Sequence, residues 1–259
     1  YTWQVALLAV FVEGLIFIVL SLTNVREAIF NAIPLTLKRG VSVGIGLFIC
    51  FIGLQNAGLA VDSSTLVTIT SFTENFNTHG ICALLALIGL IITGILMAWK
   101  VKGALFIGIL VTTVIGIPMG VTNLSNVSIS FEGISIAPTF FKLSFVGLLS
   151  KGILPLLTAI VTFAMCDCFD TVGTLIGTAG SAGMLDESGN LPRGDKALIA
   201  DAVATCTGAL MGTSTVTTFV ESSTGISEGA RTGLSSVVVG ILFLLGCVLA
   251  PIAGIIPSA

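Results

Sequence analysis

Long apolar stretches separated by short polar segments dominate this chain of 259 residues. A helix that crosses a bilayer needs roughly 20 predominantly apolar residues. Stretches of this kind lie near 3–22, 39–60, 80–99, 103–121, 150–178, 197–212 and 233–257. Because the runs are continuous rather than alternating, they predict membrane-spanning α-helices and not a β-barrel.

The polar connectors between these predicted spans fall at 23–38, 61–79, 122–149 and 179–196. In the connector 122–149 the sequence "SNVSISFEGISI" alternates apolar and polar residues. Such alternation is typical of short strands at a surface. We therefore expect strands in this connector, outside the bilayer.

Composition supports a membrane protein. Hydrophobic residues make up 55% of the chain and charged residues only 9%, whereas a soluble domain carries about 25% charged residues. A surface with so little charge suits lipid, so the sequence predicts an all-α, multi-pass protein of the cell membrane. We expect no nucleic-acid partner.

The positions of the basic residues support this arrangement of spans. If each predicted span crosses the membrane once, eight of the ten basic residues fall on one side. By the positive-inside rule that side is cytoplasmic. The eight are Arg26, Lys38, Arg39, Lys100, Lys102, Arg193, Lys196 and Arg231.

Two acids lie inside the predicted span 150–178. Asp167 and Asp170 are three residues apart, so they share one face of a helix. Ionisable residues at bilayer depth usually face a polar cavity or a partner. A carboxyl group away from water, with a second acid nearby, can hold a proton near neutral pH. A purely structural role, such as capping a neighbouring helix, is the alternative.

The stretch "GTSTVTTFVESSTGISEGARTG", residues 212–233, breaks the helical pattern at membrane depth. Its first part, up to Phe219, has the composition of a strand. Glu221 and Ser222 then open a short helix. Irregular backbone is tolerated in a membrane where it is buried in protein or lines a water-filled cavity. The pattern therefore predicts a broken helix that lines a substrate site, with a polar extracellular loop as the alternative.

Several motifs resemble one transporter family. They are "NVREAIFNAIPLTLK", "CFDTVGTLIG", "LPRGDKALIADAV" and "GTSTVTTFVESSTGISEGARTGL". Across essentially the whole chain they are similar to the nucleobase–cation symporters, the xanthine/uracil permease family. Within that family the adenine/guanine/hypoxanthine permease branch is the best match.

The resemblance implies a fold of fourteen spans in two inverted repeats of seven, in which a core domain moves against a gate domain. The chain would cover spans 4 to 11 of such a protein. Residues 1–22 would form the last span of the first core repeat, 23–121 gate spans, 122–149 an extracellular connector, and 150–259 the second-repeat core spans with the substrate site.

The resemblance also implies roles for the polar residues. Asp167, Glu221, Phe219, Thr218 and Ser222 would bind the substrate. Asp170 would serve proton coupling. No cofactor and no metal are expected, and the coupling ion would be H⁺ rather than Na⁺. Related folds suggest a homodimer.

The function implied is the import of purine nucleobases, guanine and hypoxanthine with adenine as a further candidate, by proton symport. The alternatives are a xanthine/uracil or anion transporter of the same fold, or a channel. An anion site would favour a cation beside the short helix, where this chain has Glu221. The sequence contains no motif of a nucleophile elbow or a phosphate loop, so an enzyme is not predicted.

Overall fold

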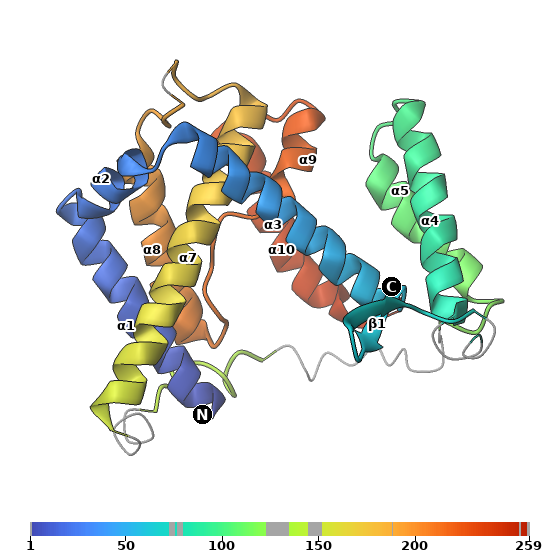
Figure 1. Ribbon diagram of the computed structural model, residues 1–259, viewed down its shortest axis with the longest axis horizontal. Coiled ribbons are helices and arrows are strands. Elements are labelled where there is room, and N and C mark those ends of the chain that lie inside the picture. Colours follow the sequence, from blue (N-terminus) through green and yellow to red (C-terminus); the bar gives the residue numbers. More distant parts are fainter. Residues whose placement is uncertain are drawn as a thin grey trace. The chain divides into compact units, whose positions relative to one another are not determined.

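The computed structural model describes residues 2–72, 76, 80–122, 135–144, 152–187, 189–253 and 255–257. These residues form two compact units. The first comprises 1–45 and 135–231, and the second comprises 46–134 and 232–259. The ribbon of the chain is drawn in Figure 1.

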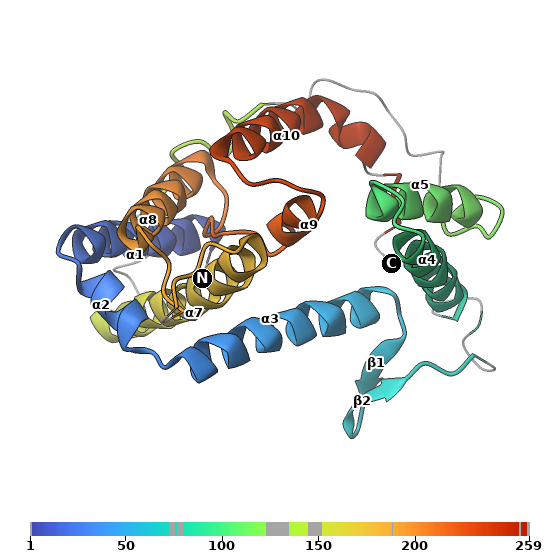
Figure 2. The ribbon, with the colours of Figure 1, turned by 90° about the horizontal axis from the view of Figure 1, so that it is seen from above.

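The first unit contains the residues of interest. Its helices are α1 (Trp3–Leu22), α2 (Val25–Ala32), the first part of α3 (Leu35–Asn56), α7 (Ile153–Ala182), α8 (Gly194–Met211) and the short α9 (Ser222–Ser227). Helix α1 packs against α7 and α8, and α9 packs against α7. Figures 1 and 2 both show α1, α7 and α8 side by side.

Helix α1 buries one face and exposes another. The buried positions Val10, Glu13, Gly14, Phe17 and Ser21 recur at the three- and four-residue spacing of one helical face. At Gly14 the helix approaches α8 so closely that a Cβ atom would lie 2.6 Å from Cys206 Sγ. Glycine is therefore required for this packing.

A hydrophobic core joins α2, α7 and α8. Its buried members are Phe30, Val172, Leu175, Ile176 and Leu198. Apolar packing therefore holds together α2, α7 and α8, three of the helices that carry the charged residues described below.

The second unit contains the rest of α3, a hairpin, α4 (Ile81–Ala98), α5 (Ala104–Gly116) and α10 (Gly233–Ala253). The hairpin pairs β1 (Ala60–Ser63) with β2 (Leu66–Ile69) in antiparallel register, with Ser63 opposite Leu66. Helices α4 and α5 pack against each other.

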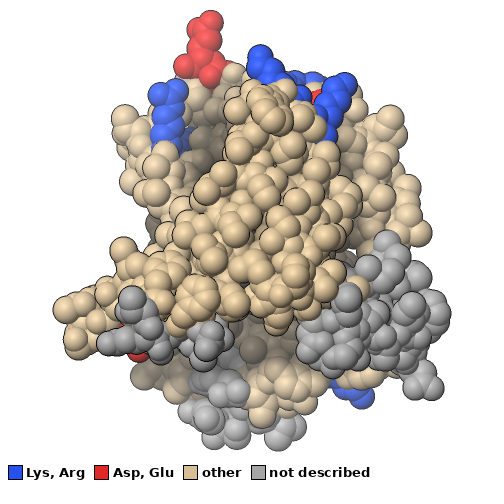
Figure 3. Space-filling model, turned by 90° about the vertical axis from the view of Figure 1, so that its right-hand side faces the viewer, with Lys and Arg blue, Asp and Glu red and all other residues tan. Residues whose placement is uncertain are grey.

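The helices agree with the predicted spans to within a few residues, and the described part of the chain is mostly helical, as expected for a multi-pass membrane protein, although it also contains the β1–β2 hairpin. In the described part, α1, α3, α4 and Leu157–Ala182 are each long and apolar enough to cross a membrane. Helices α5 and α10 provide shorter apolar segments. Uncharged side chains cover most of the face drawn in Figure 3.

The bounds of α3 and the hairpin that follows it differ from the sequence predictions. Helix α3 starts four residues before the predicted span, directly after Pro34, whose carbonyl accepts hydrogen bonds from the amides of Leu37 and Lys38. It also ends earlier, before the left-handed Gly58 (φ 72°). The hairpin β1–β2 was not predicted. The strands predicted from "SNVSISFEGISI" fall largely on 123–134, outside the described residues.

The strand predicted before α9 is not formed. Residues 213–219 are neither helical nor paired as a strand. In the described part of the chain the only sheet is β1–β2, so residues 213–219 have no neighbouring strand there to complete a ladder. Whether this segment belongs to a broken helix of an inverted-repeat fold stays a prediction, as does the division into core and gate domains.

Candidate functional site: a buried charge cluster beside an irregular segment

Asp167 lies buried in α7 and faces α2. Its Oδ2 atom is 3.5 Å from Nη2 of Arg26, and the two side chains are only 2% and 3% exposed. Neither carboxylate oxygen accepts a hydrogen bond from the described residues. Asp167 is therefore held by charge attraction to Arg26 rather than by hydrogen bonds.

Arg26 is the centre of the surrounding polar contacts. Its Nη2 donates a hydrogen bond of 2.8 Å to Oδ2 of Asp201 on α8, and its Nη1 donates one of 3.0 Å to the carbonyl of Leu198. The guanidinium also lies 4.0 Å from the ring centroid of Phe17, a cation–π geometry. One cation thus ties α1, α2, α7 and α8 together.

Local backbone explains how Arg26 reaches this position. Asn24 adopts a left-handed conformation (φ 57°) between α1 and α2. Asparagine tolerates this conformation better than most residues, and it reverses the chain after α1. Arg26 therefore lies in the first turn of α2 and is directed back toward α8.

Glu13 completes the group, which we call the buried charge cluster: Glu13, Arg26, Asp167 and Asp201. Glu13 is fully buried on α1, and neither carboxyl oxygen has a hydrogen-bond partner among the described residues. Its helix α1 packs against α2, α7 and α8, which carry the other three members. The cluster holds three acids and one base.

Asp170 takes part in a different contact. Its Oδ2 accepts a hydrogen bond of 3.1 Å from Oγ1 of Thr217. This bond joins α7 to the irregular segment 213–219. The same segment is fixed to α8, where Thr205 donates a 3.1 Å hydrogen bond to the carbonyl of Val216.

Gly212 allows the segment to turn back along α8. Its φ of 95° is left-handed, and the amide of Thr213 bonds to the carbonyl of Gly208 at 3.0 Å. This is the usual way in which glycine ends a helix. The chain then runs back past α8, which places Thr217 beside α7.

The other predicted substrate residues lie at the start of α9. Glu221 is exposed at the N-cap position of α9, followed by exposed Ser222. Phe219 is 55% exposed, and Thr218 is half-buried. The structure thus places Asp170 next to the segment that carries these residues. Asp167, in contrast, forms an ion pair with Arg26.

A small polar cavity of about 200 Å³ lies nearby in the first unit. Hydroxyl groups from three segments line it, namely Ser42 of α3, Thr174 and Thr178 of α7, and Ser223 of α9. None of the predicted substrate residues lines this cavity. Hydroxyl side chains of α7 and α9 therefore line the same cavity.

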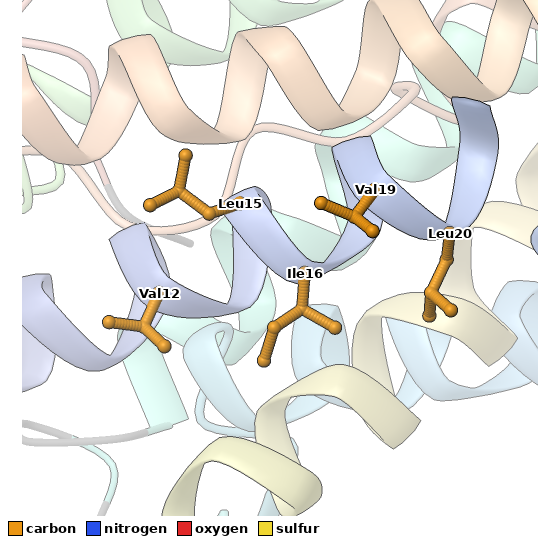
Figure 4. A pocket seen from close by; sticks show the side chains of 5 residues that line it. All are labelled: Val12, Leu15, Ile16, Val19 and Leu20. Atoms are coloured by element: carbon orange, nitrogen blue, oxygen red, sulfur yellow. The ribbon is translucent and has the colours of Figure 1, made fainter. Parts of the chain in front are cut away.

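A second hollow, of about 290 Å³, is apolar. Figure 4 shows its lining, which comes from α1 alone: Val12, Leu15, Ile16, Val19 and Leu20. With no polar group in its lining, the hollow is a hydrophobic surface of the kind that lipid covers.

Sequence reasoning missed the roles of Arg26 and Asp201, and for Glu13, an acid in the middle of an apolar span, it left open a pairing with another residue or a bound proton. Arg26 was counted among the cytoplasmic loop charges, but it is buried. The available signal was Glu13 itself, because an acid in the middle of an apolar span requires a partner. Which residue serves as that partner depends on the packing of four helices.

Within the described ranges, no group of three or more His, Cys, Asp or Glu side chains could hold a metal ion. In the buried charge cluster the guanidinium of Arg26 occupies the space between the two aspartates.

Comparison with known proteins decides the family. The model of the permease family matches residues 1–259, the whole chain. The chain belongs to this permease family. Its members are transporters rather than enzymes, and it is a multi-pass protein of the cell membrane. The resemblance inferred from the motifs is confirmed.

Individual relatives are similar over nearly the whole chain. A permease of Methanocaldococcus jannaschii is 49% identical over 98% of the chain and 56% of its own length. The guanine/hypoxanthine permease PbuG of Bacillus subtilis is 44% identical over 99% and 57%. The adenine permease AdeP of Escherichia coli is 39% identical over 99% and 55%. The chain spans about half the length of these relatives.

Proposed function

We propose that the chain is part of a permease that imports purine nucleobases, guanine and hypoxanthine with adenine as a further candidate, by proton symport. The names of the guanine/hypoxanthine and adenine permeases that it resembles support the substrate class. The proposal places the base between α7 and the segment that leads into α9.

The observation that carries this placement is the hydrogen bond between Asp170 and Thr217. It joins the two motifs that sequence analysis singled out, which are more than forty positions apart in the chain. The packing of α9 against α7 supports the same arrangement. Binding is proposed for Asp167, Glu221, Phe219, Thr218 and Ser222, with proton coupling at Asp170.

The chemistry of an oxo-purine suits these residues. Such a base presents ring N–H donors beside carbonyl acceptors. The exposed carboxylate of Glu221 can accept two adjacent N–H donors, and the exposed ring of Phe219 offers a stacking surface. Charge-assisted hydrogen bonds of this type are the stronger ones. A base that lacks matching groups would leave Glu221 unpaired and would be rejected.

Asp167 would need to exchange partners to contact the base. Because its oxygens accept no hydrogen bond from the described residues, they retain the capacity to accept N–H donors. The attraction of Arg26 would then have to be shared between Asp167 and Asp201. Base binding at Asp167 would therefore change the charge balance of the buried charge cluster.

Substitution of the two proposed base-binding acids tests this function. In the full-length permease, Asp167→Asn and Glu221→Gln should each reduce uptake of labelled guanine by at least tenfold, because one hydrogen-bonded carboxylate is lost. Glu187→Gln, at an exposed loop position, is the matched control and should retain uptake. Normal uptake by both site variants would contradict the proposal.

A further inference from the structure

The charges of the buried charge cluster do not balance. Arg26 pairs with Asp201 at 2.8 Å and with Asp167 at 3.5 Å. No second cation is paired with these groups in the described part of the chain. With all four groups ionised, the cluster would carry two uncompensated negative charges in a region with almost no solvent exposure.

Glu13 is the member least able to remain ionised. Its relative exposure is 0%, and the described residues offer neither of its oxygens a hydrogen bond. A buried charge without a partner is far more costly than a buried neutral group. By contrast, Asp201 receives hydrogen bonds from Arg26 and, at 3.3 Å, from Thr171.

The helices around Glu13 leave little room for water. On α8, Cys206 and Thr205 approach Gly14 so closely that a Cβ atom there would lie 2.6 Å from the first and 3.3 Å from the second. On α1 itself, Leu8, Ala9 and Val10 are buried. An ionised Glu13 could not be hydrated without separation of α1 from α8.

We infer that Glu13 carries a proton whenever α1 is packed against α7 and α8, which makes the buried charge cluster a proton site distinct from Asp170. The charged and titratable groups near it are Arg26 of α2, Asp167, Cys168 and Asp170 of α7, and Asp201 and Cys206 of α8. Among these, Arg26 is the only cation.

The site is linked to the proposed substrate site through Asp167, and this link rests on the proposed function. While Glu13 is neutral, Arg26 is shared by two aspartates, and one negative charge remains uncompensated. When Glu13 loses its proton, Arg26 is shared by three carboxylates. The electrostatic attraction between Arg26 and Asp167 then changes. The proton on Glu13 would therefore alter the affinity of Asp167 for a base, which is thermodynamic coupling between two sites.

Infrared difference spectroscopy of the purified full-length permease tests the proton directly. The wild type should show the carbonyl band of a protonated carboxyl group at neutral pH. Glu13→Gln should lose this band, whereas the control Glu187→Gln should keep it. A band that persists in Glu13→Gln, or that is lost only in Asp167→Asn, would overturn the assignment to Glu13.

Should Glu13→Gln not fold, Glu13→Asp carries the same test. A shorter acid keeps the proton in a changed environment, so the band should shift. An unshifted band would overturn the inference.

Hypoxanthine binding tests the link to the substrate site. The Kd of the wild type should change with pH, and in Glu13→Gln this change should be reduced at least threefold in extent. An unaltered pH dependence in the variant would overturn the link. If the wild type binds no purine while the infrared band is present, the proposed function fails and the proton site stands.

Discussion

Arg26 of α2 makes side-chain contacts with three other helices of the first unit. It contacts an aspartate on each of two helices, a carbonyl on α8 and the ring of Phe17 on α1. Removal of one partner from a buried ion pair strands the remaining charge and costs about 3–5 kcal/mol. The same cation thus organises the fold and sets the charge of the cluster.

A double-mutant cycle measures this role. Arg26→Met should lower the free energy of unfolding by about 3–5 kcal/mol, since two aspartates would remain buried without their cation. Asp201→Asn introduced into Arg26→Met should restore part of the loss, with a coupling energy of about 0.5–3 kcal/mol. Denaturant unfolding of the purified protein gives both values.

Arg39→Met is the matched control, because Arg39 is exposed on α3. It should leave stability within about 0.5 kcal/mol of the wild type. Equal effects of Arg26→Met and Arg39→Met would contradict the ion-pair assignment, as would strict additivity of Arg26→Met with Asp201→Asn.

The sequence identified the two aspartates of α7 as candidate site residues but not their partners. Asp167 and Asp170 were recognised as unusual because carboxylates are rare at membrane depth. Their spacing of three residues suggested a common role. In the structure they have different partners, Arg26 for Asp167 and Thr217 for Asp170. Those partners come from segments remote in sequence, so the local pattern could not specify them.

At the scale of elements, hydrophobic run length was a good predictor of helices. The span predicted at 3–22 corresponds to α1 at Trp3–Leu22, and that at 80–99 to α4 at Ile81–Ala98. Helix ends and strands were predicted less well. The hairpin β1–β2 starts at the last residue of a predicted span and otherwise lies in a predicted connector. It was not predicted, because strands of four residues give little periodic signal.

The irregular segment 213–219 was recognised by composition, but its hydrogen bonding was not. Threonine-rich sequence favours a strand, yet a strand also needs a neighbour to pair with. In the described part of the chain, side-chain bonds from Thr205 and Thr217 hold the segment instead. Strand pairing is a property of the tertiary arrangement rather than of the segment alone.

The close packing of α1 on α8 gives a prediction for these elements. Gly14→Ala would place a methyl group 2.6 Å from Cys206 Sγ and 3.2 Å from the backbone nitrogen of Cys206. Overpacking of this kind costs about 1–3 kcal/mol. Denaturant unfolding should show that loss, and Cys206→Ala in the same chain should recover part of it.

Gly53→Ala on α3 is the control, because a Cβ atom at Gly53 meets nothing within 4 Å. Alanine favours a helix over glycine by about 1 kcal/mol, so this variant should be neutral or slightly more stable. A Gly14→Ala protein as stable as the wild type would contradict the close approach of α1 and α8.

At the scale of the whole molecule, the chain covers a little more than half of its relatives' length. Its first unit contains the buried charge cluster, the irregular segment and α9. The division into core and gate domains, the homodimer and the coupling ion stay predictions for the complete permease. All three follow from the resemblance to the family.

We propose that purine entry is coupled to proton entry. The most direct measurement records labelled hypoxanthine and internal pH together in liposomes that contain the full-length permease, without Na⁺. We expect saturable uptake accompanied by acidification of the interior, with uptake increased by a pH gradient. Uptake without proton movement, or uptake that occurs only when Na⁺ is added, would contradict it.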